Sequence, residues 1–156
     1  MATTVTASTL SIKISESITL NGVSRNGGTT LSVASIKSIA NRIVEVTNST
    51  NGTELVNIST APGAGVYDKN SVKYMRITNL DDTNFVIIMF TNGNGHDSGD
   101  HHWEVKLEAG KSYVIGDVSS IDAHNDIDSF SAVAVALIVA KADTAAVDVE
   151  LYIAST

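Results

Sequence analysis

The chain has 156 residues, which is the length of one ordinary domain. Ten Lys and Arg side chains against seventeen Asp and Glu give a formal net charge of −7, which argues against a nucleic-acid groove or a polybasic membrane contact as its main function. The sequence contains no cysteine, so a disulfide framework, a thiol nucleophile and a zinc–thiolate site are excluded.

The N-terminal residues 1–9 lack the charged and apolar regions of a secretory signal. The longest apolar stretch, residues 132–140, is about half as long as a membrane helix needs to be. We therefore expect a soluble polypeptide that is completed in a cytoplasm, with no membrane and no nucleic acid among its partners.

Hydrophobic residues alternate with polar ones along most of the chain, and this period of two is typical of β-strands. In the first half, the pattern predicts strands at residues 10–20, 31–36, 43–47 and 55–58. Asn21-Gly22 predicts a tight turn, and Asn26-Gly27-Gly28 predicts a second one.

The clearest strand pair lies in the centre of the chain, at residues 72–78 and 85–90, with a polar turn between them. The second of these strands is almost entirely apolar, as expected for a strand that is covered on both faces. Alternation returns at residues 103–107 and 113–115, which predict two further strands.

Two later stretches are harder to assign. Residues 116–128 are polar and predict a long loop. Residues 132–142 are rich in Ala, which favours helices, but their valines alternate with small residues, so a strand is favoured over a helix. A last strand with one solvated face is predicted at residues 147–153.

About nine strands, with no segment long enough for regular βαβ crossovers, predict an all-β fold. The leading architecture is a single-domain β-sandwich of jelly-roll type, and an immunoglobulin-like sandwich is the alternative. The Thr-rich residues 1–9 predict a flexible N-terminal arm, followed by the β-sandwich domain at residues 10–156.

Three of the four histidines, His96, His101 and His102, lie close together beside two aspartates. Imidazole and carboxylate groups are ordinary ligands of transition metals. However, His101 and His102 are adjacent, so an extended backbone directs them to opposite faces. A solvated connecting loop is therefore favoured over a metal site that these histidines would hold.

Asp126 and Asp128 are the other candidate metal ligands. Their spacing resembles the start of a calcium loop, but the Gly and the Glu that an EF-hand has at its sixth and twelfth positions are missing. An acidic solvated loop is favoured, with an irregular Ca²⁺ site as the alternative, and no cofactor is expected.

No pattern in the sequence indicates catalysis, because it contains no nucleophile elbow, phosphate loop or dinucleotide fingerprint. Asp81 and Asp82 are neighbours in a predicted tight turn, which rarely gives two carboxylates the separation that sugar hydrolysis requires. Trp103 alternates with Val105 and Leu107, so core packing is favoured over sugar stacking. We therefore expect a protein that is not an enzyme.

Four segments carry a resemblance to a known group of proteins: 41–46, 72–85 (VKYMRITNLDDTNF), 105–114 (VKLEAGKSYV) and 145–154 (AAVDVELYIA). They resemble small virion structural proteins of tailed bacteriophages, especially those of cyanophages and other aquatic phages. The resemblance implies a β-sandwich that decorates a capsid or joins a tail, usually as an oligomer. Residues 96–102 and 116–128 depart from it.

The function that this resemblance implies is that of a non-enzymatic structural component of the virion, made in the host cytoplasm. A capsid decoration or cement protein that bridges capsid subunits is the first interpretation; a tail or fibre component, or a carbohydrate-binding module for host attachment, is the alternative. The implied partners are the major capsid protein, neighbouring virion proteins and further copies of the chain, and a trimer would suit the three-fold positions of a shell.

The N-terminal arm supplies the candidate interface residues, Thr3, Thr4, Val5 and Thr6. An extended segment of this kind would add as an edge strand to the sheet of a neighbouring subunit, and so cover an edge that would otherwise be sticky.

Overall fold

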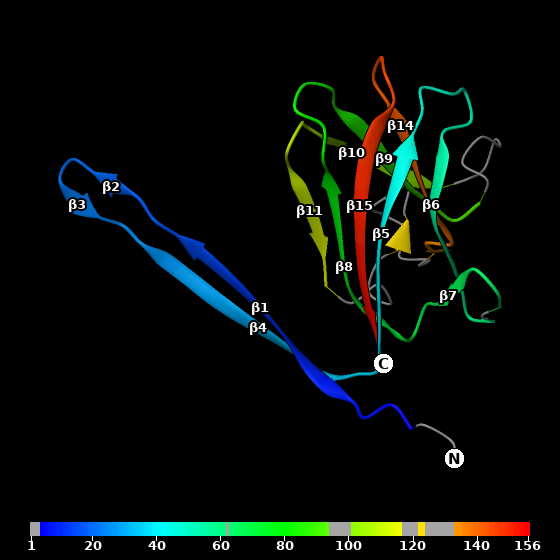
Figure 1. The fold of residues 1–156 in the computed structure, drawn as a ribbon, viewed down its shortest axis with the longest axis horizontal. Coiled ribbons are helices and arrows are strands. Elements are labelled where there is room, and N and C mark those ends of the chain that lie inside the picture. Colours follow the sequence, from blue (N-terminus) through cyan, green and yellow to red (C-terminus); the bar gives the residue numbers. More distant parts are fainter. Residues whose placement is uncertain (1–3, 62, 94–100, 117–121, 124–132) are drawn as a thin grey trace.

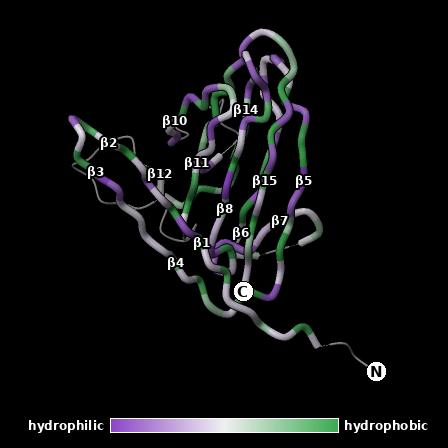
Figure 2. The backbone as a smooth tube through the Cα atoms, turned by 60° about the vertical axis from the view of Figure 1, so that its left-hand side comes forward, coloured by the Kyte–Doolittle hydropathy of each residue, from purple (hydrophilic) through white to green (hydrophobic). Residues whose placement is uncertain are grey.

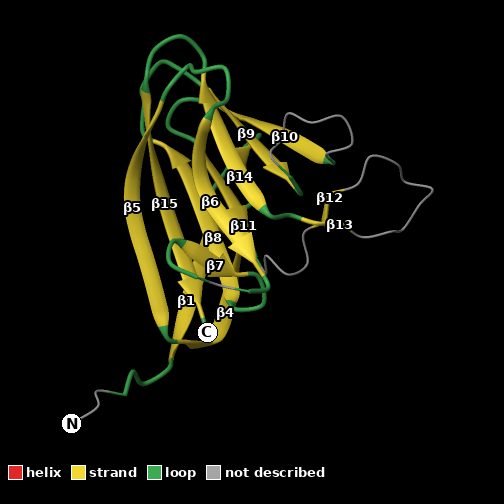
Figure 3. Ribbon diagram, turned by 90° about the vertical axis from the view of Figure 1, so that its right-hand side faces the viewer, coloured by secondary structure: helices red, strands yellow, loops and turns green. Residues whose placement is uncertain are grey.

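The computed structural model describes residues 4–61, 63–93, 101–116, 122–123 and 133–156 (Figure 1). All regular secondary structure in these ranges is β-strand, and none of it is helix (Figure 3). The all-β fold class expected from the period of two is therefore confirmed.

Two larger sheets form the body of the molecule. The four-stranded sheet has the order β11 (Ser112–Ile115), β8 (Val72–Asn79), β15 (Val147–Ser155), β5 (Ser38–Val46). The five-stranded sheet has the order β10 (His102–Leu107), β9 (Val86–Thr91), β14 (Leu137–Ala142), β6 (Thr53–Ser59), β7 (Val66–Asp68). A small pair, β12 (Asp122–Ala123) with β13 (Val133–Ala134), lies before β14 in the chain.

A long hairpin precedes the body and projects away from it (Figure 1). Its two long strands are β1 (Ser8–Glu16) and β4 (Gly27–Ile36), and its tip consists of β2 (Thr19–Leu20) and β3 (Val23–Ser24). The boundary expected at residue 10 lies inside β1, whereas the first strand that joins the body is β5. We call residues 8–36 the hairpin arm.

The two sheets of the body share one hydrophobic core. Strict alternation along β15 shows how the sequence directs this packing, because Val149 and Leu151 are fully buried, whereas Asp148 between Val147 and Val149 is exposed. The largest fully buried side chains come from both sheets: Phe90, Leu55, Met75, Ile77, Ile88, Ile138, Leu151 and Ile153.

The order of strands in the sheets follows a regular rule. With the short β7 and the small pair β12–β13 set aside, eight strands of the body follow one another in the chain as β5, β6, β8, β9, β10, β11, β14 and β15. The first, eighth, third and sixth of these make the four-stranded sheet, and the second, seventh, fourth and fifth make four strands of the other. All pairings among these eight are antiparallel, and only β7 pairs in parallel, with β6.

Several details differ from the expectations. The described residues contain fifteen strands, of which nine belong to the two larger sheets. The turn predicted at Asn26-Gly27-Gly28 is wrong, because both glycines pair within β4. Cross-strand closeness explains the glycine at position 28, since a Cβ there would lie 3.0 Å from the main-chain oxygen of Ile14. Residues 137–142 form a strand, as the spacing of their apolar residues favoured.

A buried amide holds the turn that follows β8. The side-chain nitrogen of Asn79 donates to the main-chain oxygens of Asn84, at 2.9 Å, and of Leu107, at 3.1 Å, while its oxygen accepts the N–H of Asp81 at 2.9 Å. Asp81 in turn accepts the amides of Asn84 and Thr83, and these hydrogen bonds hold its pKa below the ordinary value. Asp81 is therefore a structural residue of the turn.

Replacing Asn79 by Ala is expected to lower the free energy of unfolding by about 3 kcal/mol, because buried acceptors lose their donors. Urea denaturation measures this change. Asn41→Ala, at an exposed position of β5, is the matched control and should cost under about 0.5 kcal/mol. Equal losses in the two variants would contradict the structural role of Asn79.

A second prediction concerns Gly52, whose φ of 68° is in the left-handed region. A Cβ there would lie 2.6 Å from Cγ1 of Val139 and 2.9 Å from the main-chain oxygen of Ala140. Gly110 has the same φ of 68° with nothing within 4 Å of its Cβ position, so Gly110→Ala measures the backbone strain alone, about 1 kcal/mol. Thermal unfolding should show Gly52→Ala to be less stable than Gly110→Ala by a further ~2 kcal/mol; indistinguishable melting curves would contradict the close approach to β14.

Candidate functional site

The hairpin arm is formed by an antiparallel ladder with a tight turn at its tip (Figure 1). Asn21 and Gly22 both have positive φ, 50° and 78°, as a type I′ turn requires, so the predicted Asn-Gly turn is confirmed. Near the tip, the main-chain N–H groups of Arg25 and Ile18 donate to Ile18 O and to Asn26 Oδ1, which fixes the last strands against each other.

The register of the ladder makes the arm amphipathic, and Figure 2 shows that hydrophobic and hydrophilic residues are mixed along its strands. Ile12 lies opposite Leu31 on one face, which also carries Leu10 opposite Val33. The other face is polar and carries Lys13 opposite Thr30 together with serines at positions 11, 15 and 32. One side of this two-stranded ribbon is therefore suited to a hydrophobic contact.

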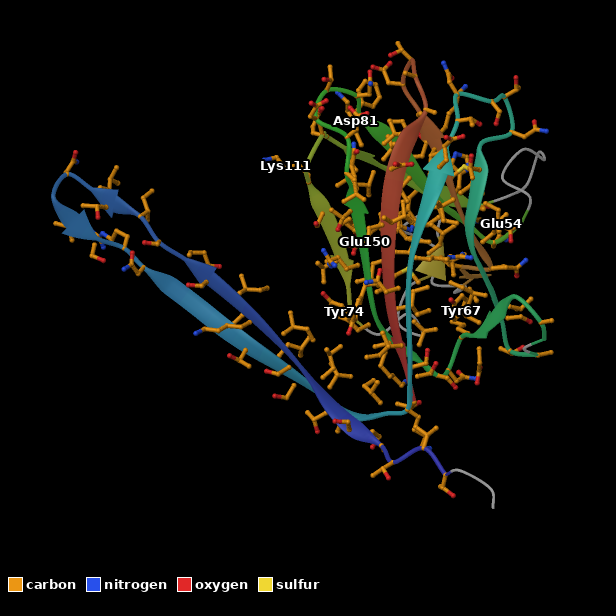
Figure 4. All side chains as sticks on the ribbon, in the orientation of Figure 1. Glu54, Tyr67, Tyr74, Asp81, Lys111 and Glu150 are labelled. Carbon is orange, nitrogen blue, oxygen red and sulfur yellow. The ribbon has the colours of Figure 1, made fainter. Side chains whose placement is uncertain are left out.

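The half of the apolar face nearest the body is covered. Leu10, Ile12 and Val33 pack against a small cluster on the outer face of the four-stranded sheet, which contains Tyr74 and Tyr152. The two tyrosine rings meet edge to face with centroids 6.1 Å apart. Tyr74 lies on β8 near the end of the sheet from which the arm departs (Figure 4), and only 5% of it is exposed. This contact fixes the arm to the body.

A β-bulge completes the attachment. Leu10 pairs with Val33 and Ser8 with Ile36, so β4 has one residue more than β1 between these pairs. Ser35 absorbs the extra residue with a φ of 64°. Because of the bulge, Ile36 and Val33 belong to the same cluster, although two residues lie between them, an interval that would place them on opposite faces of a regular strand. The irregularity therefore sets where the arm leaves the body.

The far half of the arm, residues 14–31, is uncovered; we call it the distal arm. Ile14 is 49% exposed and Leu31 is 47% exposed, and the tip adds Ile18, Leu20 and Val23, each more than half exposed. A two-stranded hairpin with no covering layer is at best marginally stable in water. Exposed apolar surface shared by several neighbouring side chains is typical of interaction sites, so the distal arm is the candidate functional site.

The arm also differs in charge from the rest of the chain. It contains Lys13, Arg25 and Glu16, a formal charge of +1, which leaves −8 for the remaining residues of a chain with net −7. A weakly basic arm is therefore joined to a strongly acidic body, and the two attract when they belong to different molecules.

The predicted interface residues lie just before the arm. Thr4, Val5 and Thr6 are exposed and belong to no strand, and Thr3 lies outside the described residues. The element that presents an edge and an apolar face is the hairpin arm that follows them. Its Asn-Gly turn was visible in the sequence, but its separation from the body was not.

The candidate metal ligands are only partly placed. His96, Asp126 and Asp128 lie outside the described residues. The main-chain N–H of His101 donates to Oδ1 of Asn92 at 2.7 Å, and His102 is exposed at the start of β10. Within the described ranges, no group of three His, Cys, Asp or Glu side chains gathers as metal ligands would.

Three aromatic residues of the body, Phe90, Trp103 and Tyr113, pack together in its core or against it. Trp103 stacks on Phe90 with ring centroids 4.1 Å apart and planes 8° apart, and Tyr113 packs against both rings. This agrees with the core packing expected from the alternation around Trp103. In the described part of the chain, the exposed large hydrophobic side chains are all aliphatic, which suits protein contacts better than sugar stacking.

Comparison with protein-family models, with curated proteins and with solved structures finds no match to this chain. The described residues contain no helix that could cross a membrane.

The attachment of the arm predicts a pH dependence. Burial raises the pKa of Tyr74 above its ordinary value of 10.0. The stability that neutral Tyr74 contributes is thus fully present below pH ~10 and is lost as the pH rises through the raised pKa. Tyr74→Phe removes this ionisation, so the variant should lose less stability than the wild type between pH 7 and about pH 11. Urea midpoints at both pH values measure the difference, and identical losses would show that Tyr74 does not ionise in a buried contact.

Proposed function

We propose that this chain is a non-enzymatic structural component of a tailed-phage virion, and more specifically a capsid decoration or cement protein that bridges capsid subunits. The observation that carries the proposal is the hairpin arm, which leaves a compact body and keeps half of its apolar face free. A protein with such an arm is built to join other molecules.

The fold of the body supports a role of this kind. The strand order first, eighth, third, sixth in one sheet and second, seventh, fourth, fifth in the other supports a jelly roll, with β7 added at an edge. We therefore include a jelly-roll β-sandwich in the proposal. Jelly rolls occur in viral capsid proteins and also in lectins, so the fold agrees with the function and does not by itself select it.

The dimensions and chemistry of the arm suit bridging. Its nine-residue strand β1 spans about 30 Å at the usual rise per residue, so the tip reaches well beyond the body. The sequence is poor in charge, with 17% charged residues, so its surfaces can be buried without removing many ions from water. Such an element would span the seam between neighbouring subunits and resist their separation.

The alternative, a tail-associated or carbohydrate-binding module, shares the same fold. The arm favours the structural interpretation, because a sugar-binding module has no need of an apolar ribbon that projects from its body. Asp68 and Asp81 also accept hydrogen bonds within their own turns, from Ser71 and Asn84 among others, which assigns both carboxylates to structure.

Quantitative mass spectrometry of purified phage particles tests the proposal. A copy number equal to that of the major shell protein, or a simple fraction of it, is expected for a decoration protein. A handful of copies per particle would favour the tail alternative, and absence from particles would overturn the proposal.

A further inference from the structure

The outer face of the four-stranded sheet has an uncovered strip in which two isoleucines alternate with polar side chains. It lies on β5, the edge strand, where Ile39 is 56% exposed and Ile43 is 62% exposed. The register places these residues opposite Ala154 and Glu150 of β15, so they lie on the outward side of the sheet. We call the outward residues of β5, which are Ile39, Asn41, Ile43 and Glu45, the β5 strip.

The β5 strip continues a surface that already binds the arm. Ala154 is fully buried beneath the arm of its own chain, and Ile39 is its direct cross-strand neighbour. The covered part of the arm is likewise continuous with its uncovered part, since Ile14 follows Ile12 on the same face. Within one chain, the contact therefore covers only part of the apolar face of the arm and only part of the outer face of the four-stranded sheet.

The charges of the two free surfaces are complementary. At the end of the β5 strip, Glu45 lies directly opposite Asp148, and a pair of like charges in this position is destabilising. Neither carboxylate forms an ion pair within the described part of the chain. Arg25, near the tip of the arm, is a cation that a second molecule can supply to this pair.

The spacings also agree. Leu31 lies six positions after Arg25 in the arm, and Glu45 lies six positions after Ile39 on β5. In extended strands both intervals correspond to about 20 Å. When Leu31 lies over Ile39, Arg25 therefore comes within reach of Glu45.

We propose that the distal arm of one copy lies on the β5 strip of a second copy, with Ile14 and Leu31 against Ile39 and Ile43, and with Arg25 directed toward the Glu45–Asp148 pair. This inference names the partner of the arm as another copy of this chain. It rests on the proposed function only because it treats the arm as an element of assembly.

The purified full-length chain provides the first test, by sedimentation velocity over a range of concentrations. The wild type should form an oligomer, and Ile14→Ser with Leu31→Ser should weaken the association about a hundredfold or more, since two buried aliphatic contacts are lost. The matched control is Thr30→Ala with Ser32→Ala, on the polar face of the same strands, which should leave the association unchanged. A wild type that is monomeric at high concentration would overturn the inference.

Charge reversal tests the register of the contact. Arg25→Glu and Glu45→Arg should each weaken the oligomer, and the double variant should restore it, because the opposite charges then face each other again. Failure of the double variant to recover association beyond either single variant would overturn the predicted pairing.

Crosslinking supplies a test that does not depend on the stability of weakened variants. The chain has no cysteine, so Leu31→Cys in one preparation and Ile39→Cys in another create unique partners. Mild oxidation of the mixture should yield a disulfide-linked dimer of the two different variants. Glu104→Cys, exposed on β10 of the other sheet, replaces Ile39→Cys as the control and should give at most a tenth of the product. Equal yields from the two mixtures would overturn the inference.

The two proposals fail separately. An oligomer that forms through the arm, in a protein that is absent from phage particles, would leave this inference standing and remove the virion function. A protein that decorates particles but fails the variant and crosslinking tests would keep the virion function and lose the second copy as the partner of the arm.

Discussion

A ribbon of two strands has one apolar face and no second layer of its own, and this constraint shapes the whole molecule. Half of the ribbon finds its second layer within the chain, where Leu10 and Val33 pack over Tyr74 and Tyr152. The other half has no covering layer among the described residues, and a bare hairpin gains little from burial to offset the entropy of ordering it. The two sheets of the body cover each other, whereas the distal arm has no second layer, and this is why we propose a partner for it.

The arm and the body differ in how they bury apolar residues and in the sign of their charge. The body buries most of its apolar residues between two sheets, although Ile39 and Ile43 stay exposed on β5, and the chain outside the arm carries an excess of negative charge. Such a charge keeps free molecules apart. The arm is slightly basic and apolar on one side. In the proposed assembly, the distal arm and the β5 strip overcome that repulsion at one contact of defined geometry.

The sequence was informative wherever local chemistry decides the structure. Alternation located the longer strands of the body but missed the short β7 and β12, the latter inside the predicted loop at residues 116–128. The Asn21-Gly22 pair located the tip of the arm, because that turn needs residues that tolerate positive φ. The glycines at 27 and 28 were misleading. Glycine often marks a turn, but Gly28 instead allows β4 to approach β1 closely. The projection of the arm was not predictable, because Ile14 and Ile12 have the same pattern and differ only in whether a sheet lies beneath them.

The bulge at Ser35 sets the direction in which the arm leaves the body. Ser35 lies where β4 passes from the contact with Tyr74 toward β5, and its positive φ is one that a non-glycine residue adopts at an energetic cost. A rotation of about 10° at this point would displace the end of a 30 Å strand by roughly 5 Å. The curvature of any lattice built from these molecules is therefore sensitive to a single backbone angle, and substitutions around Ser35 can retune it while the core is left untouched.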